Sequence, residues 1–136
     1  SHGHLFKNIA IQSLKKNPRI NIYGNNYKTK DGTCVRDYIH VIDLAKAHLS
    51  AIDYLASNKS LFVNLSSGSG YSVLDVIKIA EKITLQKIKF KYVKRRLGDP
   101  PELISDTQKS KKELGWTTKF SNMESIIKTM WDIYKK

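Results

Sequence analysis

The segment from Gly24 to Ala45 constrains the fold most, because its residue pattern changes twice within a short distance. It begins as a polar, turn-rich loop and continues as a short extended stretch that carries Arg36 and Tyr38. It then enters a helical apolar pattern at His40-Val41. Such a change from extended to helical periodicity is typical of α/β proteins. Positions two apart in an extended stretch point to the same side, so Arg36 and Tyr38 can reach one ligand.

Helical and extended patterns alternate along the rest of the chain as well. Apolar spacing and end signals predict helices over residues 4–16, 41–56 and 73–83, from Asp106 to Leu114, and from Ser121 to Tyr134. Apolar runs and alternation predict strands over residues 20–23, 61–65 and 88–92, the second of them a buried, parallel-type strand. Ser72 with Asp75, and Ser121 with Glu124, have the spacing of capping boxes. The chain is therefore predicted to be a small mixed α/β fold.

Size and composition limit the class of protein. A chain of 136 residues with 40% hydrophobic content can build one compact domain. No apolar run approaches the roughly 18 residues that span a bilayer, so we expect no membrane partner. The beginning of the chain lacks a charged stretch followed by an apolar one, so no signal peptide is expected. Cys34 has no cysteine partner for an internal disulfide, which favours a reducing cytoplasm.

The formal net charge of +12 raises the question of a polyanionic partner. The lysines are scattered, however, and most fall where the predicted helices face water. We therefore expect a solvated basic surface and no nucleic-acid partner. A small anionic ligand is the alternative use of the charge, and a non-catalytic nucleotide-binding or nucleic-acid-binding module stays open as a different class of function.

A second arginine segment runs from Lys94 to Pro101 and directly follows the predicted strand at residues 88–92. Ligands in α/β folds bind at strand ends, which is where Arg95 and Arg96 fall. Asp99 can accept hydrogen bonds from sugar hydroxyl groups. Two separate guanidinium groups, here Arg36 and Arg96, neutralise a diphosphate better than one does. The two segments together therefore favour a diphosphate ligand over a simple surface ion pair.

Other motifs are weak or lacking in the sequence. Tyr23 could stack on a planar ring, and the backbone of Asn21 could pair with the edge of a base, although a tyrosine at a strand end more often only packs. The serine- and glycine-rich stretch at residues 66–70 does not fit a phosphate-binding fingerprint. No tyrosine is followed four residues later by lysine, and the histidines and the cysteine lack the spacing of a zinc site.

The whole chain resembles the C-terminal part of the UDP-galactose 4-epimerases, which are extended short-chain dehydrogenases/reductases. The run from Gly24 to Ala45 matches a signature of that family almost residue for residue. Arg95-Arg96-Leu97-Gly98-Asp99 is similar to its Arg-Arg-x-Gly-Asp motif. Asp106 and Lys109, with Glu113-Leu114-Gly115-Trp116, are similar to its ending. The resemblance covers residues from about His4 to Tyr134.

The resemblance assigns binding roles to particular residues. It implies that Arg36 and Arg96 bind the UDP diphosphate and that Asp99 binds the uridine ribose. It implies that Tyr23 packs on uracil and that Asn21 offers backbone contacts. The remaining positions implied to contact the UDP-sugar are Tyr38, His4, Leu5 and Leu103. Leu103 falls beside the C2 group of the sugar, where leucine is smaller than tyrosine and would leave room for an N-acetyl group.

The family's chemistry is the interconversion of UDP-glucose and UDP-galactose, by hydride transfer between sugar C4 and NAD through a 4-keto intermediate. Because the Tyr-x-x-x-Lys base and the NAD fingerprint belong to an N-terminal domain that this sequence does not include, the resemblance implies no catalytic residue in this chain. We expect it to bind at most part of a nucleotide sugar and to bind no NAD alone. In the family, residues 41–56 and 61–65 look like elements that complete the NAD domain, so without that domain they would leave apolar surface exposed. We therefore expect the chain to self-associate, for instance as a homodimer, to swap elements, or to derive from a longer enzyme. A UDP-N-acetylglucosamine 4-epimerase, or another nucleotide-sugar epimerase or dehydratase, is the alternative within enzymes.

Overall fold

The computed structural model describes residues 5–15, 19–57 and 60–135 and has the expected mixed α/β architecture. The helices are α1 (Leu5–Ser13), α2 (Val41–Ser57), α3 (Val73–Thr84), α4 (Gln108–Leu114) and α5 (Met123–Tyr134). The strands are β1 (Arg19–Tyr23), β2 (Val35–Asp37), β3 (Gly70–Ser72), β4 (Lys89–Val93) and β5 (Glu102–Leu103). Predicted and observed helices agree to within a few residues.

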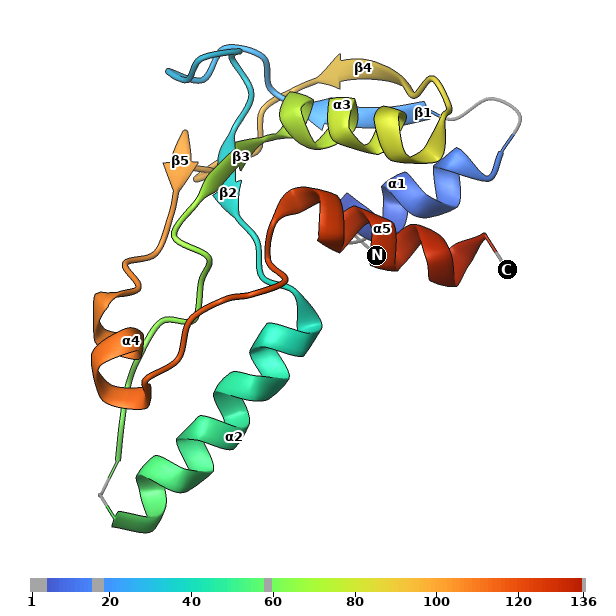
Figure 1. Cartoon of the computed structure of the whole chain (residues 1–136). Helices are drawn as coiled ribbons and strands as arrows, with labels where there is room; N and C mark the ends of the chain where they lie inside the picture. Colours follow the sequence, from blue (N-terminus) through green and yellow to red (C-terminus); the bar gives the residue numbers. More distant parts are fainter. Residues whose placement is uncertain (1–4, 16–18, 58–59, 136) are drawn as a thin grey trace.

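The main core lies where α1, α3 and α5 pack together beside a two-stranded parallel sheet of β1 and β4 (Figure 1). Side chains alternate along a strand, so Ile20 and Ile22 of β1 point into this core while Arg19 and Asn21 point away. Val76, Ile77 and other apolar side chains of the three helices complete it. Burying this apolar surface is the dominant favourable contribution to folding here.

A second, three-stranded sheet has the order β3-β2-β5. β2 pairs with β3 antiparallel and with β5 in parallel, so that Arg36 lies opposite both Tyr71 and Leu103. The short central strand β2 thus ties the loop after β1 to the segment that follows β4. This pairing brings the two arginine segments of the sequence close together.

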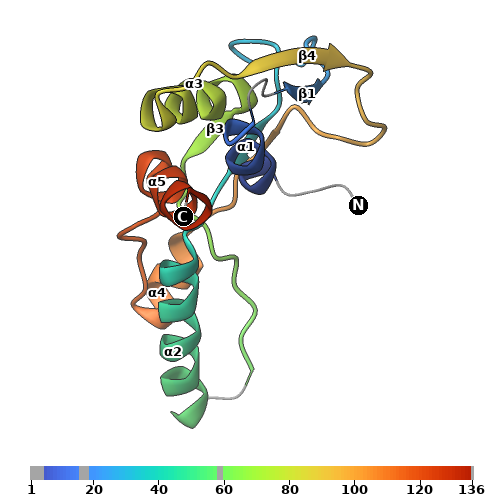
Figure 2. The ribbon, with the colours of Figure 1, turned by 90° about the vertical axis from the view of Figure 1, so that its right-hand side faces the viewer.

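The long helix α2 extends away from the main core, and the short helix α4 packs against it (Figures 1 and 2). Its first turn is held by Asp43, which is fully buried. The Asp43 carboxylate accepts hydrogen bonds from the backbone N–H groups of Lys119 and Phe120 and from the hydroxyl of Ser121, at 3.0, 2.7 and 2.7 Å. This network joins the start of α2 to the segment before α5.

Two details of the sequence prediction are wrong. Ser72 and Asp75 do form the capping box of α3. The cap of α5, however, is Asn122, whose side chain accepts from the Ser125 N–H at 2.8 Å. Ser121 cannot serve there, because its hydroxyl donates to Asp43 and accepts from the backbone N–H of His40.

The apolar run Leu61–Leu65 is the second correction, because it forms no strand. The prediction needed a neighbouring strand to supply hydrogen bonds and cover both faces. No strand of the described residues pairs with the run, and the Phe62 side chain is 85% exposed. The run instead lies beside α2, where Leu61, Val63 and Leu65 line an apolar groove of about 140 Å³.

Candidate functional site

A cavity of about 390 Å³ lies between α1, β1, β2 and the turn after β4. Both arginines singled out from the sequence, Arg36 and Arg96, line it. The described residues that line the cavity are Leu5, Asn8, Gln12, Arg19, Ile20, Asn21, Ile22, Tyr23, Cys34, Arg36, Tyr38, Val73, Arg96 and Asp99. Its volume falls in the range typical of small-ligand sites.

The cavity runs along the edge of β1 that faces away from β4. All residues from Arg19 to Tyr23 contribute to its lining, although their side chains alternate between two faces. A strand can present consecutive residues in this way only along its edge. Within the described residues β1 pairs with β4 alone, so the N–H and C=O groups on this edge, apart from the Arg19 N–H that donates to Gln12, can bond a ligand that has its own donors and acceptors.

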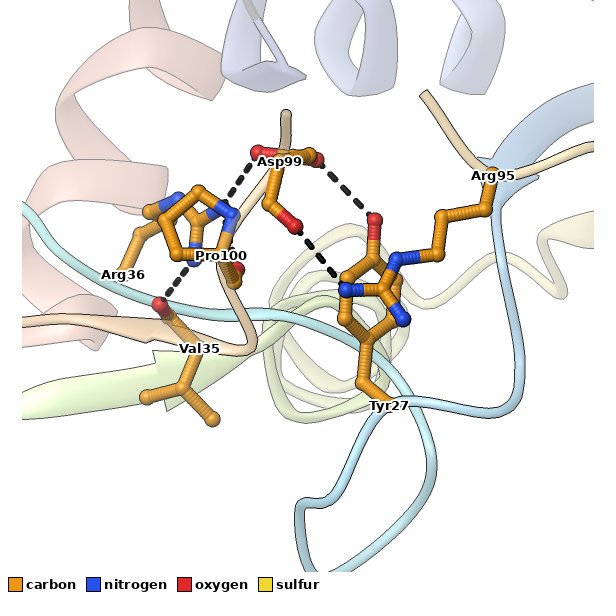
Figure 3. A network of polar contacts seen from close by, with 6 residues as sticks. All are labelled: Tyr27, Val35, Arg36, Arg95, Asp99 and Pro100. Carbon is orange, nitrogen blue, oxygen red and sulfur yellow. Dashed lines mark hydrogen bonds and ion pairs between the residues drawn. The ribbon is translucent and has the colours of Figure 1, made fainter. Parts of the chain in front are cut away.

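Arg36 is held at the cavity by hydrogen bonds from its guanidinium group (Figure 3). One terminal nitrogen donates to the Val35 carbonyl at 2.6 Å. The other donates to the Asp99 carboxylate at 2.5 Å and to the Pro100 carbonyl at 2.9 Å. The ion pair therefore lies with Asp99, not with the neighbouring Asp37, whose carboxylate accepts from Ser66 and from the Ser105 N–H. The N–H groups of Arg36 outside these bonds remain to bond an anion.

Two further arginines stack on tyrosine rings beside the cavity. The guanidinium carbon of Arg96 lies 4.0 Å from the centre of the Tyr23 ring, and that of Arg95 lies 3.9 Å from the centre of the Tyr27 ring. Such stacking fixes the plane of a guanidinium group and leaves its edge N–H groups free of the ring. Arg95 also donates to the Asp99 carbonyl at 3.1 Å.

Tyr38 is part of both the cavity and the core. Its ring packs edge-on against Phe6 with 4.7 Å between ring centres. Burial raises the pKa of Tyr38 to about 12, and the charges of Cys34 and Asp37 add to the increase. The phenol therefore stays protonated at neutral pH and can act as a hydrogen-bond donor. Burial likewise raises the pKa of the nearby Cys34 thiol, so Cys34 is not primed as a nucleophile.

The structure gathers most of the residues that the sequence singled out. Around the one cavity it brings together Leu5, Asn21, Tyr23, Arg36, Tyr38, Arg96 and Asp99. Leu103 does not line the cavity; it is 57% exposed on β5, opposite Arg36. His4 lies outside the described residues. That these residues bind a nucleotide sugar stays a prediction.

Several cavity residues were missed from the sequence. Two of these are Asn8 and Gln12, which follow the predicted site residue Leu5 at helical spacing, so that the three form one stripe of α1 facing the cavity. The amphipathic pattern of α1 contained this signal, but two polar residues on a helix face are ordinarily assigned to solvent. Tyr27 is absent from the lining, but it bonds Asp99 of the lining and stacks with Arg95.

Across residues 5–15, 19–57 and 60–135, no group of histidine, cysteine, aspartate and glutamate side chains is arranged to hold a metal ion. In the same residues, no helix has the length and apolar character needed to cross a membrane.

Comparison with known sequences places these features in a family. At the level of the fold, the chain is the small mixed α/β part of an extended short-chain dehydrogenase/reductase enzyme, because solved structures of such enzymes superpose on it. The chain belongs to the family described as GDP-mannose 4,6 dehydratase, whose sequence model matches residues 4–130.

Curated relatives are longer than this chain. A UDP-glucose 4-epimerase of Lacticaseibacillus casei is 46% identical over 83% of the chain and 34% of its own length. A UDP-glucose 4-epimerase of Streptococcus mutans is 46% identical over 94% of the chain and 39% of its own length. The chain therefore spans between a third and two fifths of these relatives.

Solved structures give the same result. The chain superposes on UDP-glucose 4-epimerase from Brucella ovis in complex with NAD with a TM-score of 0.91, at 34% identity, over 98% of this chain and 41% of that one. For the UDP-glucose 4-epimerase from Bifidobacterium longum in complex with NAD+ and UDP, the TM-score is 0.87 at 38% identity, over 95% of this chain and 38% of that one. For the UDP-Glc/GlcNAc 4-epimerase from Campylobacter jejuni, the TM-score is 0.85 at 41% identity, over 96% of this chain and 40% of that one.

Proposed function

We propose that the chain is the C-terminal, UDP-sugar-binding part of an NAD-dependent UDP-glucose 4-epimerase. The single observation that carries the proposal is the shared cavity, in which Arg36 and Arg96 lie with Tyr23 and Asp99. Two guanidinium groups suit a diphosphate, an aromatic ring suits a base, and a carboxylate suits a ribose diol. The cavity thus offers one feature for each part of UDP.

In this proposal each residue keeps one task. Arg36 and Arg96 bind the diphosphate, with Arg36 oriented by its ion pair to Asp99. Tyr23 packs on uracil while the edge of β1 at Asn21 bonds its polar atoms. Tyr38 donates a hydrogen bond from its protonated phenol toward the diphosphate side. Leu5, and His4 outside the described residues, contact the diphosphate and the sugar.

The complete enzyme would hold NAD in an N-terminal domain, and NAD would there accept and return the hydride of sugar C4. This chain would contribute binding energy and orientation of the sugar nucleotide, not the catalytic base. Alone it is expected to bind the UDP part and to turn over no substrate. The reducing cytoplasm is the expected location, as Cys34 suggests.

Calorimetry with UDP tests the proposal directly. We expect the chain to bind UDP, and we expect Arg36→Ala and Arg96→Ala each to weaken binding at least about tenfold, because each removes a charge-assisted hydrogen-bond donor. Lys89→Ala is the matched control, since this exposed cation on β4 does not line the cavity. Equal weakening by Lys89→Ala would show only nonspecific attraction to the basic chain.

A nucleic-acid-binding role makes the opposite prediction. A random oligonucleotide would then bind with a steep dependence on salt, and UDP would not compete with it. Such a result, together with no heat of UDP binding, would replace the present proposal.

A related function is an epimerase that also accepts UDP-N-acetylglucosamine. It is favoured by the similarity to the Campylobacter jejuni UDP-Glc/GlcNAc 4-epimerase and by Leu103, which lies opposite Arg36 and is smaller than tyrosine. Turnover of UDP-N-acetylglucosamine by the complete enzyme, reduced by Leu103→Tyr while UDP-glucose turnover persists, would support it. No turnover of the N-acetylated sugar would exclude it.

A further inference from the structure

Tyr27 is a buried residue that contacts the candidate site without lining it. It lies in the loop between β1 and β2, and its side chain is 4% exposed. Its phenol donates a hydrogen bond to Oδ2 of Asp99 at 3.1 Å, across 72 residues of sequence (Figure 3). Burial, followed by the bond to Asp99, raises the pKa of the Tyr27 phenol, so the group remains a donor at neutral pH.

Both oxygens of the Asp99 carboxylate accept hydrogen bonds from neighbouring side chains. Oδ1 accepts from Arg36 at 2.5 Å, and Oδ2 accepts from Tyr27. A carboxylate with different partners on its two oxygens cannot rotate about its terminal bond without breaking one contact. Each oxygen keeps further capacity as an acceptor, and Asp99 lines the cavity. The direction in which Asp99 can accept a bond from a ligand is therefore fixed by Arg36 and Tyr27 together.

The same tyrosine also supports the backbone of this turn. Arg95 stacks over the Tyr27 ring and donates to the Asp99 carbonyl, so the side chain and the main chain of Asp99 both depend on Tyr27. The ring in turn packs against Gly24, where an added Cβ would lie 2.6 Å from it. The ring of Tyr27 thus stacks with Arg95, and its hydroxyl bonds Asp99. A mutation that removes only the hydroxyl can separate these two contributions.

We propose that Tyr27 is a positioning residue whose hydroxyl orients Asp99 to accept hydrogen bonds from the ribose hydroxyls of the nucleotide. This inference rests on the proposed UDP site and adds a determinant of selectivity to it. It follows that the hydroxyl of Tyr27 contributes to the preference for a ribonucleotide over the same nucleotide without ribose hydroxyls.

The test compares two ligands by calorimetry, UDP and 2′,3′-dideoxyuridine 5′-diphosphate. The unmodified chain should bind UDP more tightly. Tyr27→Phe keeps the ring and its stack with Arg95 but removes the bond to Asp99. We expect this variant to lose roughly three- to tenfold in affinity for UDP, and to bind the dideoxy ligand as the unmodified chain does.

Two controls separate positioning from general structure. Tyr92→Phe removes a hydroxyl from a tyrosine of β4 that is 44% exposed and does not line the cavity, and it should leave both affinities unchanged. Asp99→Ala, which removes the acceptor altogether, should by itself abolish the preference for UDP over the dideoxy ligand. Adding Tyr27→Phe to Asp99→Ala should then change the ratio of the two affinities no further, because Tyr27 acts through that carboxylate.

The outcomes are distinguishable. Absence of UDP binding by the unmodified chain overturns the proposed function and this inference with it. UDP binding that Tyr27→Phe weakens equally for both ligands, or leaves unchanged, overturns the positioning role alone. Should Tyr27→Phe fail to fold, 4-aminophenylalanine at this position retains a weaker donor. An intermediate preference for UDP in that variant supports the role, and no change in preference overturns it.

Discussion

Asp99 joins several segments as a single residue, because two distant parts of the chain and its own turn all bond to it. Its carboxylate bonds Arg36 of β2 and Tyr27 of the preceding loop, and its carbonyl accepts from Arg95. The side chain of Asp99 is 25% exposed, so these bonds are shielded from solvent only in part. These bonds therefore contribute more to the orientation of Asp99 than to the free energy of folding.

Gly24 offers a test of how tightly the loop holds Tyr27. Its φ of +92° is strained for any residue with a side chain, and an added Cβ would come within 2.6 Å of the Tyr27 ring. We expect Gly24→Ala to lower the free energy of unfolding, measured by urea denaturation, by more than the roughly 1–2 kcal/mol that the backbone strain alone costs.

Gly98→Ala is the matched control for this prediction. Its φ of +75° imposes similar backbone strain, but nothing lies within 4 Å of the added Cβ. The loss in unfolding free energy caused by Gly98→Ala should therefore reflect backbone strain alone. Equal losses for the two variants would mean that the Tyr27 ring moves aside freely.

The sequence pointed to Arg36 through the extended segment that it shares with Tyr38 and to Arg96 through its place after a strand, and both line the cavity. Tyr27 could not be predicted in the same way. Its contact with Asp99 depends on how β2 and the turn after β4 approach each other, and no local pattern encodes that distance. Seven of the predicted site residues meet in one cavity, whereas Leu103 lies outside it because β5 places it beside Arg36 on an exposed edge.

At the scale of an element, Asp43 fixes how α2 leaves the core. Burial raises the pKa of its carboxyl, but the hydrogen bonds from Ser121, Lys119 and Phe120 outweigh that effect and hold the pKa below its ordinary value. The carbonyl of Asp43 also accepts a bond from the Trp116 indole at 2.9 Å. One residue in the first turn thereby anchors α2 to the segment between α4 and α5.

We expect Asp43→Asn to lower the free energy of unfolding by about 2–4 kcal/mol, because an amide cannot accept all the bonds that the carboxylate accepts. Asp53→Asn, at an exposed position of the same helix, should change it little. Denaturant unfolding with both variants measures the difference. An Asp43→Asn loss no larger than that of Asp53→Asn would contradict the anchoring role.

The Asp43 carboxyl also leads us to predict that the stability of the fold depends on pH. Because the pKa of Asp43 is lower in the folded than in the unfolded state, its contribution is complete above about pH 4 and is lost as pH falls further. The difference in stability between the unmodified chain and Asp43→Asn should therefore shrink below about pH 4. A difference that stays constant there would show that proton binding to Asp43 is not linked to folding.

The elements themselves were predictable to different degrees. Helices α2 and α3 follow from strong local apolar spacing and, for α3, from its capping box. The run Leu61–Leu65 was mispredicted because a strand needs partners, which are not a local property. The cap of α5 lies one residue beyond the predicted position, because the Ser121 hydroxyl donates to Asp43 and Asn122 caps the helix.

At the scale of the whole molecule, apolar surface remains open along α2. Leu49, Ile52 and Leu55 lie three residues apart on one side of this helix and are 64, 65 and 52% exposed, and Phe62 is 85% exposed. Contiguous exposed apolar side chains of this kind favour association. We therefore predict that the chain self-associates when it is studied alone.

Sedimentation velocity over a range of concentrations tests this prediction. The sedimentation coefficient of the unmodified chain should rise with concentration, and the double variant Leu49→Lys/Ile52→Lys should remain monomeric. Lys128→Glu on α5 serves as a charge-changing control away from this surface. A monomer at all concentrations would show that the surface has too little apolar area to hold a partner.

The ion pair between Arg36 and Asp99 has a consequence for competition inside a cell. Since a neighbouring carboxylate already offsets much of the guanidinium charge, inorganic phosphate and pyrophosphate gain less at Arg36 than they would from an isolated cation. We therefore expect small inorganic anions to compete poorly at Arg36 with the proposed ligand, which also brings a heterocycle and hydroxyl groups to the cavity.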